Sequence, residues 1–129
     1  MITCILLGTT SCSSISAPLD SEFKRIANKE YVLNKYDCSN MSAEYLDSLH
    51  AKGFTNSRIW TYVTPMFKGY SVYMGHAIVE VDGIFYDPTS GSSITGFKAE
   101  LIREQSTART ISYEELQELK KSNPREWDY

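Results

Sequence analysis

Residues 75–91 encode two β-strands and the turn between them, in the stretch GHAIVEVDGIFYDPTSG. Asp82 and Gly83 form a dipeptide typical of two-residue hairpin turns, because both residues tolerate the positive φ that such a turn requires. This turn length fixes the pairing of the strands, since Val81 must then lie opposite Ile84. The stretch therefore predicts an antiparallel hairpin with a defined register.

The register brings two polar side chains together. Residues two apart on a strand share a face, and so do residues directly opposite each other. Ile78 is expected opposite Asp87, so His76 and Asp87 become diagonal neighbours with Cβ atoms roughly 5–7 Å apart. The other face of the hairpin is apolar and reads as a conventional core face, made of Ala77, Val79, Val81, Ile84 and Tyr86.

A helix over about residues 38–52 is predicted upstream of the hairpin, with Gly53 as its C-cap. Its buried stripe follows helical spacing and consists of Cys38, Met41, Ser42, Tyr45, Leu46 and Leu49. Cys38 lies in the first turn, where the helix dipole and the free N–H groups favour a thiolate. Asp37 precedes it as the expected N-cap.

Three of these residues match the requirements of nucleophilic catalysis. A thiolate nucleophile needs a base within reach and a carboxylate that fixes the tautomer of that base. Cys38, His76 and Asp87 supply these groups in that order along the chain. Each also has a purely structural interpretation: a core thiol, a strand histidine and the first residue of an Asp-Pro-Thr turn, respectively.

The remaining pattern completes an α+β domain. A helix beginning at Ser21 is indicated by the stripe Phe23, Ile26, Ala27 and Tyr31. Strands are expected over 58–63, 73–81 and 84–87. A capping box formed by Ser112 and Glu115 opens a helix to about Lys121. The segment 97–102 is ambiguous, and a loop is expected after Pro88.

Composition narrows the class of protein. The chain has 129 residues, of which 42% are hydrophobic and 22% charged, as expected for one soluble domain. Its net charge of −3 argues against a nucleic-acid partner, which normally meets a basic face. Three cysteines and two histidines at wide spacing give no structural metal site. We expect a monomer with no cofactor and no bound metal.

The first nineteen residues differ from the rest. A short apolar run at Ile5–Leu7 is followed by small residues around Cys12, a pattern similar to a bacterial lipoprotein signal. Residues 1–19 are therefore expected to be a signal segment and tether, and residues 20–129 the folded domain. This predicts an exported, membrane-anchored lipoprotein with a lipid anchor at Cys12. The alternative is a cytoplasmic protein whose N-terminus has no targeting role.

Two segments resemble the transglutaminase-like cysteine protease superfamily: YDCSNMSAEYLDSLHAKGF, residues 36–54, and the hairpin sequence, residues 75–91. In that family a Cys opens a helix, His-Ala begins a strand, and Asp-Pro-Thr ends the next strand. The resemblance covers about residues 20–91. It implies a papain-like α+β fold with the Cys helix packed on a small antiparallel sheet. It also implies that Cys38 is the nucleophile, His76 the base and Asp87 the orienting acid.

Members of that superfamily include peptidases, deamidases, crosslinking acyltransferases and inactive relatives, so the resemblance implies a protein or peptide substrate. Two alternatives stay open. One is a cell-wall amidase of the NlpC/P60 type, in which the third polar residue is most often His. The other is a non-catalytic surface-attached binding domain of the same fold. The oxyanion hole is also open: the backbone N–H of Cys38 is one candidate donor, and Asn34, Tyr36 or Trp60 is the second.

Overall fold

The computed structural model describes residues 21–65 and 73–127. The predicted signal segment, with Cys4 and Cys12, lies outside the described residues. Those residues form a mixed α+β structure, as predicted, in which helices pack on an antiparallel sheet. Within this part of the chain, no helix is both long enough and apolar enough to cross a membrane.

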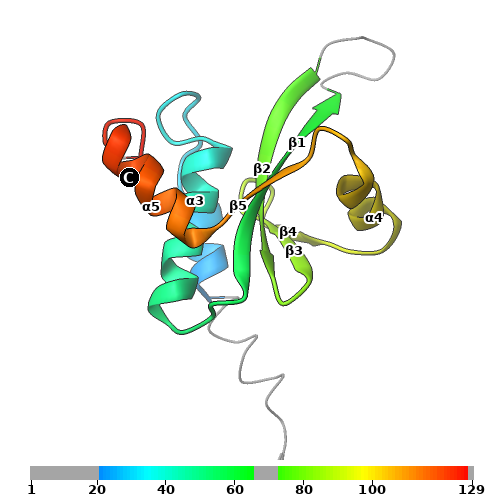
Figure 1. Ribbon diagram of the computed structural model, residues 1–129, viewed down its shortest axis with the longest axis horizontal. Helices are drawn as coiled ribbons and strands as arrows, with labels where there is room; N and C mark the ends of the chain where they lie inside the picture. The colour runs from blue at the N-terminus through cyan, green and yellow to red at the C-terminus, as the bar shows by residue number, and fades with distance from the viewer. Residues whose placement is uncertain (1–20, 66–72, 128–129) are drawn as a thin grey trace, which may run out of the picture.

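The centre of the fold is a five-stranded sheet with the strand order β4-β3-β2-β1-β5, in which every neighbouring pair is antiparallel. Its two long strands, β1 and β2, lie side by side within the sheet, and three-residue strands form its two edges (Figure 1). The strands are β1 Ser57–Pro65, β2 Tyr73–Val81, β3 Ile84–Asp87, β4 Ser92–Ile94 and β5 Arg109–Ile111.

The predicted hairpin is confirmed by the pairing of β2 with β3, in which Val81 lies opposite Ile84. Asp82 and Gly83 form the turn with φ values of 50° and 86°. Both values lie in the left-handed region that a two-residue turn requires. The chain is therefore in the register that the Asp-Gly dipeptide predicts.

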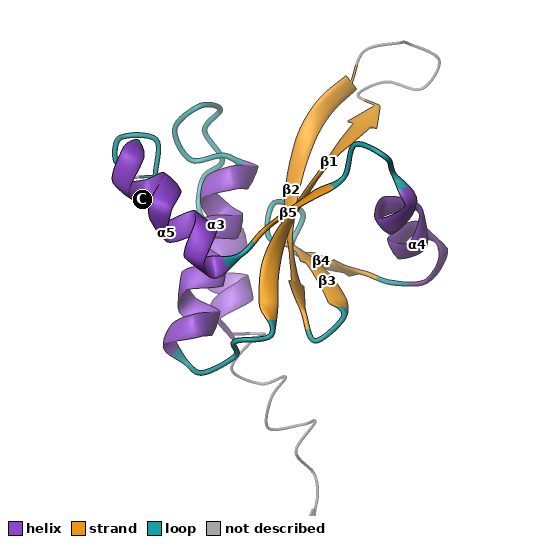
Figure 2. Ribbon diagram, in the orientation of Figure 1, coloured by secondary structure: helices purple, strands orange, loops and turns teal. Residues whose placement is uncertain are grey.

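The helix α3, Cys38–Ala51, packs against β1 and β2 on one face of the sheet. Its predicted stripe is confirmed, because every member is buried except Cys38, which is partly exposed. Asp37 is the N-cap and forms a capping box with Asn40. The helical segment 21–27 and the helix α5, Tyr113–Ser122, complete this layer (Figure 2).

The opposite face of the sheet is also covered, which the sequence pattern did not predict. Helix α4, Gly96–Glu104, lies there (Figure 2). It closes a second apolar cluster made of Tyr62, Ile78, Phe85, Ile94, Ala99 and Ile102. Ile84, by contrast, was expected in the core but is 44% exposed; it directly follows the Asp82-Gly83 turn, at the end of the hairpin. The hairpin thus buries side chains on both of its faces.

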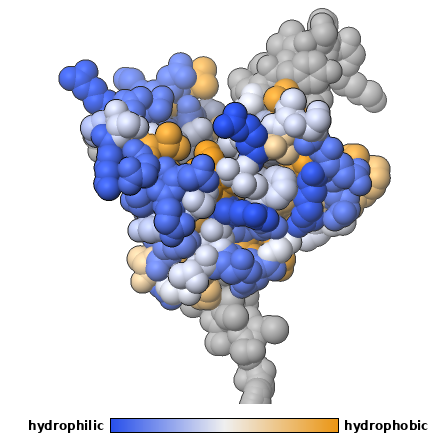
Figure 3. All heavy atoms as spheres, viewed as in Figure 1, coloured by the Kyte–Doolittle hydropathy of each residue, from blue (hydrophilic) through white to orange (hydrophobic). Residues whose placement is uncertain are grey.

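Several boundaries differ from the prediction. The first helix ends at residue 27, so Tyr31 is not part of its buried stripe and is 41% exposed. The capping box of Ser112 with Glu115 does open α5. The strands β4 and β5 were not expected. On the face shown in Figure 3, hydrophilic residues predominate and hydrophobic ones appear in small separate areas.

Candidate active site

His76 and Asp87 lie in contact at the junction of β2 and β3. The His76 Nε2 atom is 2.9 Å from Asp87 Oδ2. Asp87 Oδ1 accepts a hydrogen bond of 3.0 Å from the backbone N–H of Thr89. Both side chains are largely buried, with exposed fractions of 18% for His76 and 12% for Asp87. The carboxylate is thus held by the Asp-Pro-Thr turn and in turn holds the imidazole, as the register predicts.

Cys38 reaches the same imidazole from α3. A hydrogen bond from the Cys38 side chain and its charge both contribute to raising the pKa of His76, after the hydrogen bond of Asp87. Because Nε2 faces the carboxylate, Nδ1 is the ring nitrogen left for the sulfur. Cys38 is partly exposed and is not in a disulfide. The three predicted site residues, from α3, β2 and β3, therefore converge on one imidazole.

His76 and Asp87 each shift the pKa of the other. Burial alone would lower the pKa of His76, but its hydrogen bonds with Asp87 and Cys38 and their negative charges raise this pKa to about 9. Burial alone would raise the pKa of Asp87, but the hydrogen bond and charge of His76, with the backbone N–H groups of Ser90 and Thr89, lower it. At neutral pH the pair is therefore a carboxylate and an imidazolium.

Tyr62 on β1 forms one wall of the site. It lies opposite His76 in the sheet, and its ring meets the imidazole edge-on at 5.7 Å and 85° between the ring planes. Burial, and then the charges of Asp87 and Cys38, raise the pKa of Tyr62 to about 12. The side chain therefore stays neutral. Its ring restricts the motion of the imidazole and shields it from water.

Two of the three candidate oxyanion donors are committed elsewhere. The Trp60 indole N–H donates to Glu80 Oε1 at 3.0 Å, on the face that α4 covers. The Tyr36 hydroxyl donates to Glu44 on α3. Asn34, the third candidate, is exposed in a left-handed backbone conformation (φ 63°), and its backbone N–H donates to Asp37. None of these three contacts is directed at the Cys38 amide.

The environment of Tyr31, near Cys38, was missed by sequence reasoning. Burial, and then the charges of Cys38 and Asp37, raise the pKa of Tyr31. The helical spacing had assigned this tyrosine to a buried stripe. No local signal marked the end of the helix before Tyr31, because Lys29 and Glu30 are good helix formers.

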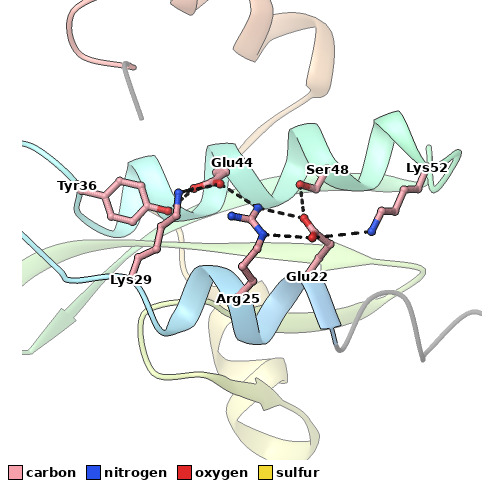
Figure 4. A network of polar contacts seen from close by, with 7 residues as sticks. All are labelled: Glu22, Arg25, Lys29, Tyr36, Glu44, Ser48 and Lys52. Atoms are coloured by element: carbon pink, nitrogen blue, oxygen red, sulfur yellow. Dashed lines mark hydrogen bonds and ion pairs between the residues drawn. The ribbon is translucent and has the colours of Figure 1, made fainter.

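The loop that carries Tyr31 is fastened to α3 by a network of polar contacts (Figure 4). Glu44, which is only 8% exposed, accepts hydrogen bonds from Lys29 Nζ at 2.8 Å and from the Tyr36 hydroxyl. Arg25 Nη2 donates to the same carboxylate at 3.0 Å. Burial alone would raise the pKa of Glu44, but these hydrogen bonds lower it. One carboxylate thus fixes both ends of the loop.

A hollow of about 230 Å³ lies beside the N-terminus of α3. It is lined by Asn34, Asp37, Ser39, Asn40, Glu126 and Trp127. The Asn40 side chain donates to the backbone carbonyl of Glu126 at 2.8 Å, which holds the C-terminal segment against the helix. The hollow is therefore lined by residues that precede and follow Cys38 in the sequence and by the C-terminal segment.

The second histidine takes no part in the site. His50 lies in the last turn of α3, the end opposite Cys38, and its ring stacks on Tyr113 at 4.0 Å and 6° between the planes. Over residues 21–65 and 73–127, no group of three or more His, Cys, Asp or Glu side chains is arranged to hold a metal ion.

Comparisons of this chain with family models, with curated proteins and with solved structures found no match. The functional assignment therefore depends on the arrangement of its own residues.

Proposed function

We propose that this chain is a thiol-dependent hydrolase or acyltransferase that acts on an amide bond through Cys38, His76 and Asp87. The observation that supports this most strongly is the position of the His76 imidazole, which interacts with Asp87 on one side and Cys38 on the other. A thiol at the first turn of a helix, paired with a protonated imidazole, is the environment that favours a reactive thiolate.

The chemistry follows from this pairing. The Cys38 thiolate attacks the carbonyl carbon of the amide, and the carbonyl π electrons move onto oxygen. The tetrahedral intermediate then expels the amine, which takes its proton from the His76 imidazolium, and a thioester to Cys38 remains. Water or an amine next gives its proton to His76 and attacks the thioester, so the product leaves and the thiolate returns. Asp87 keeps the imidazole oriented throughout.

We infer a transglutaminase-like protein of papain-like fold as the class that fits best. In support, the Cys opens α3, the His lies near the start of β2, and the Asp is the last residue of β3. An Asp as the third residue favours this class over the NlpC/P60 amidases, in which His is usual there. The proposed substrate is a protein or peptide.

Export and a lipid anchor at Cys12 remain proposals from the sequence. If Cys12 is lipidated, radiolabelled fatty acid is expected to label the wild-type protein in a bacterial host and not the Cys12→Ala variant. Equal labelling of the two proteins would contradict the anchor.

The pH dependence of Cys38 alkylation tests the proposed function without knowledge of the substrate. In a Cys4→Ser, Cys12→Ser background, iodoacetamide is expected to alkylate Cys38 rapidly at about pH 6, where a free thiol of pKa about 8.5 is nearly all protonated. His76→Ala is expected to return the rate profile to that of a free thiol. Alkylation of the parent protein only above about pH 8 would instead indicate a non-catalytic domain of the same fold.

A further inference from the structure

A groove outside the candidate active site lies between β5 and one side of α5. The chain passes directly from β5 into α5, so the two elements diverge from a common corner (Figure 1). The groove between them has a volume of about 660 Å³ and is lined by all three residues of β5. This volume falls in the range of roughly 300–1,000 Å³ that is typical of ligand sites.

The strand β5 contributes a free sheet edge to this groove. It is the last strand of the sheet and pairs with β1 along its other edge. The outer edge of such a strand presents backbone N–H and C=O groups that can pair with an added strand. Because Arg109, Thr110 and Ile111 all line the groove, this edge opens into it.

The other wall of the groove is the side of α5 that does not pack on α3. Leu116 is fully buried, and Gln117 donates to Asp47 of α3 at 2.9 Å, so these residues define the inner side of the helix. Glu118 and Leu119 follow on the adjacent side and line the groove. Leu119 is 40% exposed, which is unusual for a leucine that has a neighbouring apolar contact available.

The lining of the groove combines apolar and acidic side chains. Ile111 and Leu119 provide the apolar part. Among the described residues that line the groove, Arg109 is the single cation, against three exposed carboxylates: Glu114, Glu115 and Glu118. An occupant with basic and apolar side chains therefore complements the groove better than an acidic one.

Two of these carboxylates already have partners. Glu115 accepts the backbone N–H of Ser112 in the capping box, and Glu118 pairs with the exposed Lys121 at 3.2 Å. Glu114 is exposed in the first turn of α5, and it is the carboxylate that a substitution can change with the least effect on the helix.

We propose that this groove is a docking site for an extended, basic segment of a partner protein, which adds a strand to β5. The backbone of the segment pairs with the free edge of β5. Alternate side chains of the segment point toward α5, where an apolar one contacts Ile111 and Leu119 and a basic one meets the glutamates. Cys38 takes no part, so the inference goes beyond the proposed function and does not depend on it.

The probe is a fluorescein-labelled peptide, Lys-Thr-Val-Thr-Lys, blocked at both ends. In an extended chain its two lysines and its valine lie on one face. Binding is measured by fluorescence anisotropy at about 0.15 M salt, with a full chain that contains Cys4→Ser, Cys12→Ser and Cys38→Ala so that no thiol can react. Three further peptides are compared: Glu-Thr-Val-Thr-Glu, and the basic peptide N-methylated either at the valine amide or at both threonine amides.

We expect saturable binding of the basic peptide with a Kd below about 100 μM, and at least about tenfold weaker binding of the acidic peptide. Because only alternate amides of a strand face its neighbour, one N-methylated peptide is expected to lose binding and the other to stay within about threefold. Glu114→Lys and Leu119→Ser are each expected to weaken binding at least about fivefold. Glu104→Lys, the same charge change on the exposed surface of α4, is expected to stay within about twofold.

Other results overturn the proposal. The absence of saturable binding up to about 1 mM would show that the groove does not take such a segment. Equal loss of binding by both N-methylated peptides, or by neither, would exclude pairing with β5. If Glu104→Lys weakens binding as much as Glu114→Lys, the peptide responds only to the net charge of the protein. If Glu114→Lys and Leu119→Ser bind like the parent, with unchanged melting temperatures, the peptide binds elsewhere.

Discussion

His76 is the residue on which the site depends, because its imidazole meets an acid, a thiol and an aromatic ring at once. Asp87 binds Nε2, Cys38 interacts with the ring, and Tyr62 packs edge-on against it. Each contact comes from a different element, so the imidazole can hold this position only when the sheet and α3 are correctly assembled. The protonated ring is consequently part of the stability of the fold as well as of its chemistry.

This coupling predicts a pH-dependent stability. The pKa of His76 is about 9 in the folded protein, above the value of about 6.5 expected when it is unfolded. Because the pKa of His76 is higher in the folded state, its protonation contributes its full stabilisation to the folded protein below about pH 6.5. This contribution is lost as the pH rises through about 9. Urea unfolding is expected to show that His76→Ala loses on the order of 3 kcal/mol more at pH 6 than at pH 10. A loss that is the same at both pH values would contradict the raised pKa.

Asp87 is expected to act on Cys38 only through His76. Asp87→Asn removes the negative charge that supports the imidazolium and leaves the strand pairing intact. The alkylation profile of Cys38 is therefore expected to move toward alkaline pH, to a position between those of the parent and of His76→Ala. A profile unchanged from the parent would show that Asp87 has only a structural role, in the turn that it forms with Thr89.

At the scale of elements, Glu44 links the loop before Cys38 to α3 (Figure 4). Its partners Arg25 and Lys29 are partly exposed, which reduces the worth of each ion pair. The carboxylate itself is buried, so its loss leaves the Tyr36 hydroxyl without its acceptor.

Glu44→Gln is expected to lower the free energy of unfolding by roughly 1–2 kcal/mol, because the Tyr36 hydroxyl and two cations lose part of their acceptor. Chemical denaturation measures this effect. Glu118→Gln is the control, because its ion pair with Lys121 is exposed on α5 and is expected to contribute almost nothing. If Glu44→Gln and Glu118→Gln behave alike, the loop is not held by Glu44.

The elements that could be predicted from the sequence have strong local signals. The Asp-Gly turn fixed the β2–β3 register, and helical spacing with an N-cap located α3. The strands β4 and β5 and the helix α4 lack such signals. β4 and β5 have three residues each and exist through pairing with β3 and β1. α4 begins at a glycine, and its N-cap Thr95 makes no side-chain hydrogen bond. Their structure depends on contacts that are distant in sequence.

At the scale of the whole molecule, the sheet is covered by α3 on one face and by α4 on the other (Figure 2). The contact of His76 with Asp87 could be predicted because a hairpin register is local information. The burial of Ile78 and Phe85 on the face that carries Asp87 was not predicted, since alternation in a strand does not reveal whether its second face is also covered. Tyr31 was missed for a related reason, because helical spacing continued past the real end of the helix.

The second cluster predicts a dependence of the whole fold on α4. Phe85 is fully buried, and the Arg103 guanidinium lies over its ring at 4.4 Å. Phe85→Ala is expected to cost about 3–5 kcal/mol of stability, measured by urea unfolding. Phe97→Ala in α4 is the control, because Phe97 is 78% exposed. This change is expected to alter stability by less than about 0.5 kcal/mol. A small effect of Phe85→Ala would mean that α4 does not pack on the sheet.

Cys38 and Asp87 are proposed to hold a proton on His76 jointly, and an NMR titration of the His76 ring measures this directly. We expect a His76 pKa near 9 in the parent protein, and a clearly lower pKa in both Cys38→Ala and Asp87→Asn. A His76 pKa near 6.5 in all three proteins would show that neither residue supports the imidazolium.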